Sequence, residues 1–314
     1  MTRAFSLNTS FSLPMEHQIP LPDSTRADST ATNGDGTHAI ARDVAFKTFV
    51  FVNVGFVGVP HTGDRQWVLV DAGIIGVAGS IEKAAAECFG ENARPAAILM
   101  THGHFDHVGV LKDLAERWDV PIYAHPLELP YLDGRASYPP GDPSVGGGLM
   151  SRLSSLYPTG PVDVSQWLRP LPEDASVPGL PGWRWLHTPG HSPGHVSFWR
   201  EADRTLIVGD AFVTTKSESA YEANFAMSPE MHGPPQYFTP DWVSAKRSVE
   251  MLAALEPDLV LTGHGHPLRG AEMRAALHQL AAGFDQIAVP TQGRYVGDPA
   301  RADESGPTHV PPRN

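Results

Sequence analysis

The chain has 314 residues, which is enough for one large domain or two small ones with a substantial core. Its 23 Lys and Arg residues are outnumbered by 35 Asp and Glu residues, so the formal net charge is −12. A chain this acidic repels a polyanion unless a local basic stripe offsets the charge, and the sequence contains no such stripe. We therefore do not expect nucleic acid to be a partner.

The N-terminal part, residues 1–40, is rich in Ser, Thr, Asn, Asp and Gly and is predicted to be an arm rather than a domain. Its scattered apolar side chains could pack onto a groove or a second subunit, so we expect a homodimer. The sequence shows no signal peptide in residues 1–20 and no apolar stretch long enough to cross a bilayer. These features favour a cytoplasmic protein without a membrane partner.

Two strands are predicted before the first helix. Residues 44–59 are mostly β-branched or aromatic, and residues 67–70 repeat that composition after a polar turn, which is typical of a hairpin. Asp71 follows the second strand and is either a solvated turn residue or a hydrogen-bond partner of a metal-bound histidine. Residues 80–89 are expected to form a helix that stops at Gly90.

Three imidazoles and one carboxylate fall within six positions in the sequence His102-Gly103-His104-Phe105-Asp106-His107. Such groups need partners when they are buried, and Zn²⁺, Mn²⁺ and Fe²⁺ accept imidazole nitrogen and carboxylate oxygen as ligands. The cluster lies between a short apolar run, residues 95–100, and a helical spacing of apolar residues over 108–118. We therefore expect a metal site where a strand ends and a helix begins, a usual position for sites in open α/β sheets.

The next segment, residues 126–160, lacks a regular pattern and contains many Pro and Gly residues. This insertion is predicted to be a lid or pocket wall, a mobile loop or a subunit contact. The elements expected after it are strands 183–186, 196–199 and 205–208, helix 240–255, strand 258–261 and helix 271–284. Residues 286–314 are rich in Pro and polar groups and are predicted to be an irregular tail.

Turns rich in metal-ligand residues follow four of the predicted strands. Their motifs are His-x-His-x-Asp-His at 102–107, Thr-Pro-Gly-His-Ser-Pro-Gly-His at 188–195, Gly-Asp at 209–210 and Gly-His-Gly at 263–265. In this order, the motifs resemble those of the metallo-β-lactamase superfamily over about residues 44–285. The resemblance implies an α/β fold, an αββα sandwich of two mixed β-sheets flanked by helices. We expect one such domain, residues 41–285.

The resemblance also implies two divalent metal ions, Zn in the first place, with Mn or Fe as alternatives. Carried over to this chain, one metal would be held by His102, His104 and His191, the second by Asp106, His107 and His264, and Asp210 would bridge the two. Two metals roughly 3.5–4 Å apart can share a hydroxide that acts as a nucleophile. Asp106 is also a candidate catalytic residue, as the proton acceptor when a tetrahedral intermediate collapses.

The superfamily includes both hydrolases and oxidoreductases, so the fold does not choose the reaction. The complete ligand set favours a dinuclear hydrolase that cleaves a small, fairly apolar lactone, ester or phosphotriester. The alternative is a mononuclear iron oxidoreductase of the persulfide dioxygenase type. Lactonases of this superfamily that act on acyl-homoserine lactones usually carry a Tyr three residues after the bridging Asp. Val213 stands there in this chain, which argues against that particular substrate.

Other residues are assigned supporting roles. His195 is expected to brace its turn rather than bind metal, and His266 is expected to support the site or to be exposed. An apolar substrate pocket is expected from a further set of side chains, with ordinary core packing as the alternative for part of them. The set comprises Phe212, Phe225, Met227, Met231, Tyr237 and Phe238.

Overall fold

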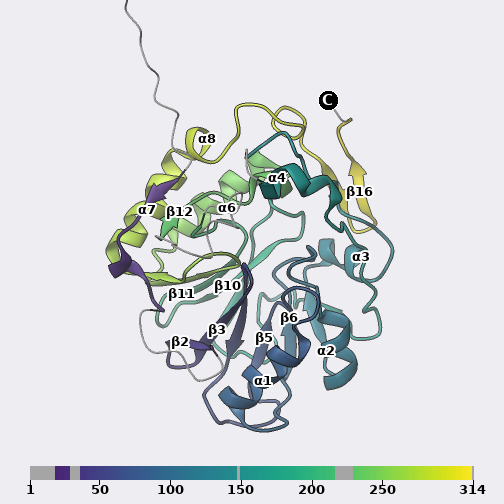
Figure 1. Cartoon of the computed structure of the whole chain (residues 1–314), viewed down its shortest axis with the longest axis vertical. Coiled ribbons are helices and arrows are strands. Elements are labelled where there is room, and N and C mark those ends of the chain that lie inside the picture. Colours follow the sequence, from purple (N-terminus) through teal and green to yellow (C-terminus); the bar gives the residue numbers. More distant parts are fainter. Residues whose placement is uncertain (1–17, 29–35, 147–148, 216–228, 313–314) are drawn as a thin grey trace, which may run out of the picture.

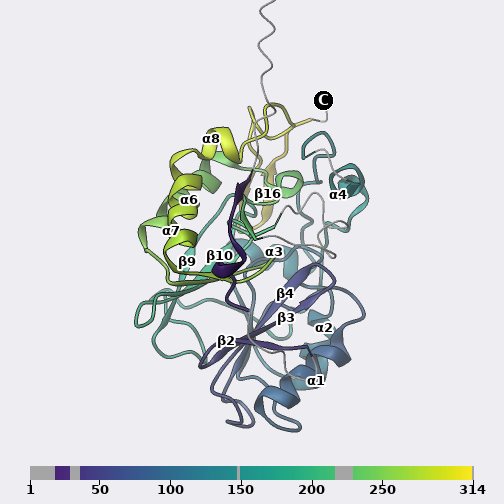
Figure 2. The ribbon, with the colours of Figure 1, turned by 60° about the vertical axis from the view of Figure 1, so that its left-hand side comes forward.

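The computed structural model describes residues 18–28, 36–146, 149–215 and 229–312. In these ranges the chain forms two large β-sheets that pack face to face, with helices on both outer sides (Figures 1 and 2), and two smaller two-stranded sheets. This arrangement confirms the predicted αββα sandwich. No helix in the described ranges is long and apolar enough to cross a membrane.

The first sheet has seven strands in the order β2-β3-β4-β5-β6-β7-β8. The strands are β2 (His38–Ala41), β3 (Val44–Phe49), β4 (Val52–Val57), β5 (Val68–Val70), β6 (Ala97–Leu99), β7 (Ile122–Ala124) and β8 (Leu168–Pro170). Pairing is antiparallel from β2 to β5 and parallel from β5 to β8. Every residue of β5 and β6 is buried, as expected for short parallel strands covered on both faces.

The second sheet has five strands in the order β14-β13-β11-β10-β9. Its strands are β9 (Trp183–His187), β10 (Val196–Arg200), β11 (Thr205–Gly209), β13 (Leu259–Thr262) and β14 (Leu268–Arg269). Only β11 and β13 pair in parallel, and the carboxyl ends of these two strands meet at the same edge as the carboxyl end of β6. Apolar side chains from both sheets, among them Leu99, Phe198 and Leu261, form the core between the sheets.

Helices bury the outer face of each sheet. On the first sheet, α1 (Ala78–Phe89) and α2 (Leu111–Trp118) pack against a core that includes Trp67 and Ile98. On the second sheet, α6 (Trp242–Ala254) and α7 (Gly270–Ala282) pack against a core around Phe212 (Figure 1). Asp241 caps α6, because its carboxylate accepts a 3.0 Å hydrogen bond from the Ser244 amide.

One strand prediction is wrong. Residues 44–59 do not form a single strand but the antiparallel pair β3 and β4, which is joined by a tight turn at Val50. Val50 has a φ of 62°, and the amide of Phe51 donates to the carbonyl of Phe49 at 2.8 Å. This is a γ-turn with a positive φ at its centre, which a β-branched residue adopts only with strain. The sequence carries no Gly, Asn or Pro there to signal a turn.

The insertion, residues 126–160, is more regular than its composition indicates. It contains η2 (Pro126–Glu128), α3 (Leu129–Leu132), α4 (Leu149–Leu153) and η3 (Ser154–Leu156). Each of these helices is shorter than two turns, so apolar periodicity could not reveal them. Tyr131 and Leu132 are fully buried, so the start of the insertion is part of the domain core.

The tail, residues 286–314, is also not irregular throughout. After α8 (Phe284–Ile287) it forms a hairpin of β15 (Arg301–Asp303) and β16 (Gly306–His309), which lies beside α3 in Figure 1. It is anchored to the insertion, because the Tyr295 hydroxyl donates to the carbonyl of Pro140 at 2.6 Å. Tertiary contacts of this kind order segments that lack a local structural signal.

Part of the arm packs on its own chain. Strand β1 (Ile19–Pro20) pairs with β12 (Glu230–Met231), and Ile19 is buried in the core of the second sheet. A 3-10 turn, η1 (Asp23–Thr25), follows, and the amide of Ala27 donates to the carbonyl of Pro267 at 2.8 Å. Residues 1–17 and 29–35 of the arm lie outside the described residues.

Candidate metal centre

The predicted metal ligands lie together at one edge of the sandwich, where strands of both sheets end. Four of them are in the loop between β6 and α2, and the others follow β9, β11 and β13. Each is buried, with a relative exposure of 7% or less. The seven residues are His102, His104, Asp106, His107, His191, Asp210 and His264.

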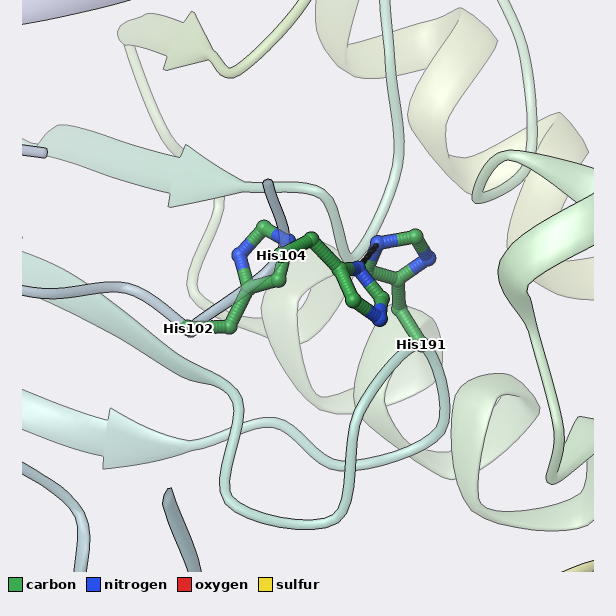
Figure 3. Close-up of side chains that lie close together, drawn as sticks. All are labelled: His102, His104 and His191. Atoms are coloured by element: carbon green, nitrogen blue, oxygen red, sulfur yellow. Dashed lines mark hydrogen bonds between the residues drawn. The ribbon is translucent and has the colours of Figure 1, made fainter. Parts of the chain in front are cut away.

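The first group consists of His102, His104 and His191. One ligand atom from each lies within 4.8 Å of the others. The three imidazoles converge although they come from two different loops (Figure 3), and Nδ1 of His104 lies 2.8 Å from Nε2 of His191. The structure thus brings together the side chains that were predicted to hold one metal.

The second group consists of Asp106, His107 and His264, whose ligand atoms also lie within 4.8 Å of one another. Nε2 of His264 is 3.5 Å from Oδ2 of Asp106. The first two residues belong to the loop after β6, whereas His264 belongs to the turn after β13. This group therefore spans both sheets, as the first group does.

Asp210 lies between the two groups. Its Oδ2 is 3.4 Å from Nε2 of His191 in the first group. The same oxygen is 3.1 Å from Nε2 of His264 and 3.7 Å from Nε2 of His107 in the second group. A carboxylate in this position is placed to contact cations in both groups.

The donor set fits divalent metal binding. Nε2 of His102, Nε2 of His107 and Oδ1 of Asp210 are buried and have no hydrogen-bond partner among the described residues. Buried polar atoms are usually paired, so three such atoms in one cluster fit a cation-binding site. Imidazole nitrogens and carboxylate oxygens are ligands of Zn, Mn and Fe.

Electrostatics of the first group and of Asp210 agree with metal binding. In the second group, neighbouring carboxylates that include Asp210 outweigh burial and raise the pKa values of His107 and His264. Burial lowers the pKa of His104 to about 3 and also lowers the pKa values of His102 and His191, which keeps these imidazoles neutral. Burial opposes ionisation of Asp210, but the imidazoles of His264 and His107 outweigh it and lower the pKa of that carboxyl. Neutral imidazoles and an ionised carboxylate are the forms that bind a metal.

At least two of the candidate ligand histidines, His107 and His264, are oriented by hydrogen bonds from their other ring nitrogen. Nδ1 of His107 lies 2.8 Å from Oδ2 of Asp71. The Thr101 hydroxyl also donates to this oxygen at 2.8 Å, and the Thr101 amide donates to Oδ1 of Asp71 at 2.8 Å. Nδ1 of His264 lies 2.8 Å from the carbonyl oxygen of Phe51. Such partners fix which nitrogen faces the metal. Of the two roles predicted for Asp71, the structure therefore selects the support of a histidine.

Four histidines outside the two groups have other partners. Nε2 of His195 accepts from the backbone amide of Asp210 at 2.8 Å, which confirms that His195 braces a turn. His266 binds Oδ2 of Asp28 in the arm at 2.8 Å. His125 and His187 stack on each other with ring centroids 4.1 Å apart.

Two supporting residues were not predicted from the sequence. Glu128, in the insertion, is 1% exposed and accepts hydrogen bonds from the loops that carry His102 and His191. Asn53, in β4, donates to the carbonyl oxygens of Thr262 and Gly265 at 2.9 and 2.7 Å and so holds the turn of His264. Neither residue belongs to a motif. The only sequence signal for them is a polar residue next to apolar ones.

An aromatic cluster borders the first group. Phe238 stacks on the ring of His104 at a centroid distance of 5.0 Å. Phe105 and Tyr157, 5.2 Å apart, continue this cluster and are partly exposed. Of the residues assigned to a pocket, Tyr237 and Phe238 belong to this cluster, and Phe212 and Met231 belong to the buried core. Phe225 and Met227 lie outside the described residues.

A two-sheet sandwich with this His and Asp centre at its strand ends is typical of one class of protein. The family model described as "Metallo-beta-lactamase superfamily" matches residues 48–264, and the chain belongs to this superfamily.

Its relatives include two proteins of Bacillus subtilis strain 168. The probable metallo-hydrolase YflN is 43% identical over 259 residues, which covers 82% of this chain and 97% of that protein. The probable metallo-hydrolase YybB is 33% identical over 206 residues, covering 66% of this chain and 78% of that protein.

Among solved structures, a beta-lactamase domain protein from Burkholderia ambifaria matches with a TM-score of 0.53 and 25% sequence identity. The match covers 82% of this chain and 79% of that protein. The similarity supports the two-sheet fold described above.

Proposed function

We propose that the chain, as a metal-dependent hydrolase of the metallo-β-lactamase superfamily, works with two metal ions and cleaves a small, fairly apolar lactone, ester or phosphotriester. The observation that carries the dinuclear proposal is the position of Asp210. Its Oδ2 lies 3.4 Å from a nitrogen of the first group and 3.1 Å from a nitrogen of the second. A single metal would not need an anion between two complete ligand groups.

The proposed ligands are His102, His104 and His191 for one metal, and Asp106, His107 and His264 for the other, with Asp210 shared. Zn is the first candidate, and Mn or Fe also suit this donor set. Bound there, the metals would supply a nucleophile at neutral pH and polarise the bond to be cleaved. Asp106 is the residue proposed to accept a proton as the leaving group departs.

The aromatic cluster supports an apolar substrate. Phe105 and Tyr157 are partly exposed beside the first group, and Phe238 covers one face of His104. A substrate bound at the metals would meet these rings, which favour an alkyl or aryl group over a charged one. Aromatic rings do not distinguish a lactone from an ester, so the proposal covers both.

Metal analysis and a substrate panel test the proposal together. The purified protein should contain about two Zn or Mn ions per chain and should hydrolyse at least one of a set of lactones, aryl esters, thioesters and phosphotriesters. A single Fe per chain with oxygen uptake would instead support a mononuclear oxidoreductase. Two metals without hydrolysis of any member of the panel would contradict the proposed substrate class.

A further inference from the structure

Glu128 is a carboxylate whose four hydrogen bonds all come from the neighbourhood of the first metal group. Its Oε2 accepts from the backbone amide of Gly103 at 3.0 Å and from the hydroxyl of Tyr138. Its Oε1 accepts from the hydroxyl of Ser192 at 2.7 Å and from the amide of Gly194 at 2.8 Å. A carboxylate offers about four acceptor sites, so this one is saturated.

Three of these four partners belong to the two loops that supply the first group, and Tyr138 belongs to the insertion. Gly103 lies between His102 and His104, in the loop after β6 of the first sheet. Ser192 and Gly194 follow His191, in the loop after β9 of the second sheet. One side chain therefore ties together two loops that are far apart in the sequence and that share one metal group.

The approach of the backbone to Glu128 leaves no room for side chains. A Cβ atom at Gly103 would lie 2.6 Å from the hydroxyl oxygen of Tyr138, and one at Gly194 would lie 2.8 Å from the Cγ of Glu128. Such distances are below van der Waals contact. Gly194 is thus required for direct contact between its loop and the carboxylate, and Gly103 is required for the close approach of the Tyr138 hydroxyl.

The hydrogen bonds of the Glu128 carboxylate described above do not include the turn that carries His264. His264 is held by a different set of contacts, in which Asn53 donates to the carbonyl oxygens of Thr262 and Gly265. The hydroxyl of Thr48 donates to Oδ1 of Asn53 at 2.7 Å and fixes the orientation of its amide. Each metal group thus has its own buried polar residue that holds one of its loops in place.

We propose that Glu128 is a positioning residue for the metal held by His102, His104 and His191, and that Asn53 is its counterpart for the metal held with His264. This proposal rests on the dinuclear function proposed above. It adds that the two metals are stabilised separately, by residues that touch neither of them. The change of either residue should therefore weaken one metal more than the other.

Glu128→Gln is the sharpest test, because it changes hydrogen bonding with almost no change in volume. Each carboxylate oxygen accepts from one hydroxyl and one backbone amide. A hydroxyl can rotate to accept from the new NH₂ group, but a backbone N–H cannot. Whichever way the glutamine amide turns, its NH₂ group faces the N–H of Gly103 or of Gly194, so one of the two backbone hydrogen bonds to this side chain is lost and its loop is held less firmly. The Gly103 amide would keep the Tyr138 hydroxyl oxygen, 2.9 Å away, as an acceptor.

The measurement is a cobalt(II) titration of the metal-free protein, with affinity, stoichiometry and the visible spectrum of the bound ion as readouts. His104→Ala and His264→Ala provide reference spectra of proteins that lack the first or the second group. In Glu128→Gln we expect the affinity of one cobalt ion to fall by about 10- to 100-fold. The cobalt that remains should give the spectrum of His104→Ala, and Asn53→Ala should give the spectrum of His264→Ala.

Unchanged affinity for both ions in folded Glu128→Gln would overturn the proposal, and so would loss of the second ion before the first. If Glu128→Gln does not fold, the double variant Tyr138→Phe with Ser192→Ala decides, because it removes the hydroxyl donors and keeps the carboxylate. It should weaken the first cobalt by several-fold, and wild-type affinity would contradict the role of Glu128.

Failure of the proposed function gives a different result. A wild-type chain that binds two cobalt ions but cleaves no substrate would leave the inference about Glu128 intact. A wild-type chain with one metal would end the dinuclear proposal. Weaker binding of that single metal in Glu128→Gln would then still support Glu128 as a positioning residue, and unchanged binding would refute it.

Discussion

Asp210 is the residue at which the two metal groups meet, and its charge matters more than its shape. Its Oδ2 lies within 3.4 Å of both His191 and His264, while Oδ1 has no hydrogen-bond partner in the described part of the chain. Two dications placed close together repel each other, and an anion between them lowers that repulsion. A neutral side chain of the same size cannot do so.

We therefore predict that Asp210→Asn lowers the metal content from about two ions per chain towards one. It should also lower kcat/KM by about two to four decades, equivalent to roughly 3–5 kcal/mol of transition-state stabilisation. The fold should persist, because the apolar strands hold the sheets together. Metal analysis and kinetics on the best substrate of the panel test this. Unchanged activity with one metal would mean that a single metal suffices.

His264 and His266 are two residues apart but have different surroundings. His264 belongs to the second metal group, whereas His266 binds Asp28 of the arm at 2.8 Å. His264→Ala should remove one metal and reduce activity by more than about 100-fold. His266→Ala should keep both metals and destabilise the fold by about 1 kcal/mol, through loss of one partly buried hydrogen bond. Greater metal loss in His266→Ala would show that the ligands are assigned wrongly.

At the scale of elements, the turn between β3 and β4 combines strain with a contact to the site. Val50 has a positive φ of 62° and is 56% exposed, so it gains little from packing. The next residue, Phe51, accepts a hydrogen bond from Nδ1 of His264 through its carbonyl. The strain at Val50 thus lies one residue from a contact that orients a proposed metal ligand.

Glycine at this position should relieve the strain. Val50→Gly is expected to raise the free energy of unfolding by roughly 1 kcal/mol, because the relief of 1–3 kcal/mol exceeds the entropic cost of glycine. Urea unfolding of the wild type and the variant measures the change. Val59→Gly, at another exposed valine, is the control and should not stabilise the protein. A less stable Val50→Gly would show that the turn is not strained.

Only part of the candidate site and of the fold could be predicted from the sequence. The candidate ligands in residues 102–107 could be predicted because strand, loop and helix follow one another locally there and give a recognisable motif. Glu128 and Asn53 were not found, because their importance comes from loops that are distant in the sequence. The turn at Val50 was missed because the tertiary structure imposes a backbone conformation that the residue itself disfavours.

For the whole molecule, the homodimer stays a prediction, and the structure changes how it should be tested. Ile19 is buried against the core of its own chain, so removal of the whole arm would expose apolar surface. A version that lacks only residues 1–17 avoids this problem. Light scattering should show a dimer for the full chain and a weaker dimer for the shortened one. A monomer in both cases would end the prediction. The cytoplasmic location stays a prediction as well.

The two sheets are also linked by a pair of stacked histidines. His125 follows β7 of the first sheet, and His187 ends β9 of the second, with ring centroids 4.1 Å apart and planes within 12°. Burial, with a smaller effect of the His187 imidazole, lowers the pKa of His125 to about 4. The Leu127 amide donates to Nδ1 of His125, so the neutral ring is the form that fits the folded chain.

This pair should make the fold sensitive to acid. Because the pKa of His125 is lower in the folded chain than its ordinary value of 6.5, the unfolded chain binds more protons between about pH 6.5 and pH 4. The contribution of His125 to the free energy of unfolding is therefore fully present above pH 6.5 and is lost as the pH falls from about 6.5 to about 4.

The variant His125→Asn removes this titration and keeps an acceptor for the Leu127 amide. Between pH 7 and pH 5 the variant should lose about 1 kcal/mol less stability than the wild type, after allowance for partial exposure of the ring. Urea unfolding of both proteins at both pH values gives this difference. Protonation of the candidate metal ligands changes the stability of both proteins equally, so it does not contribute to the difference. An equal loss in the two proteins would mean that His125 is as easily protonated in the folded chain as in the unfolded one.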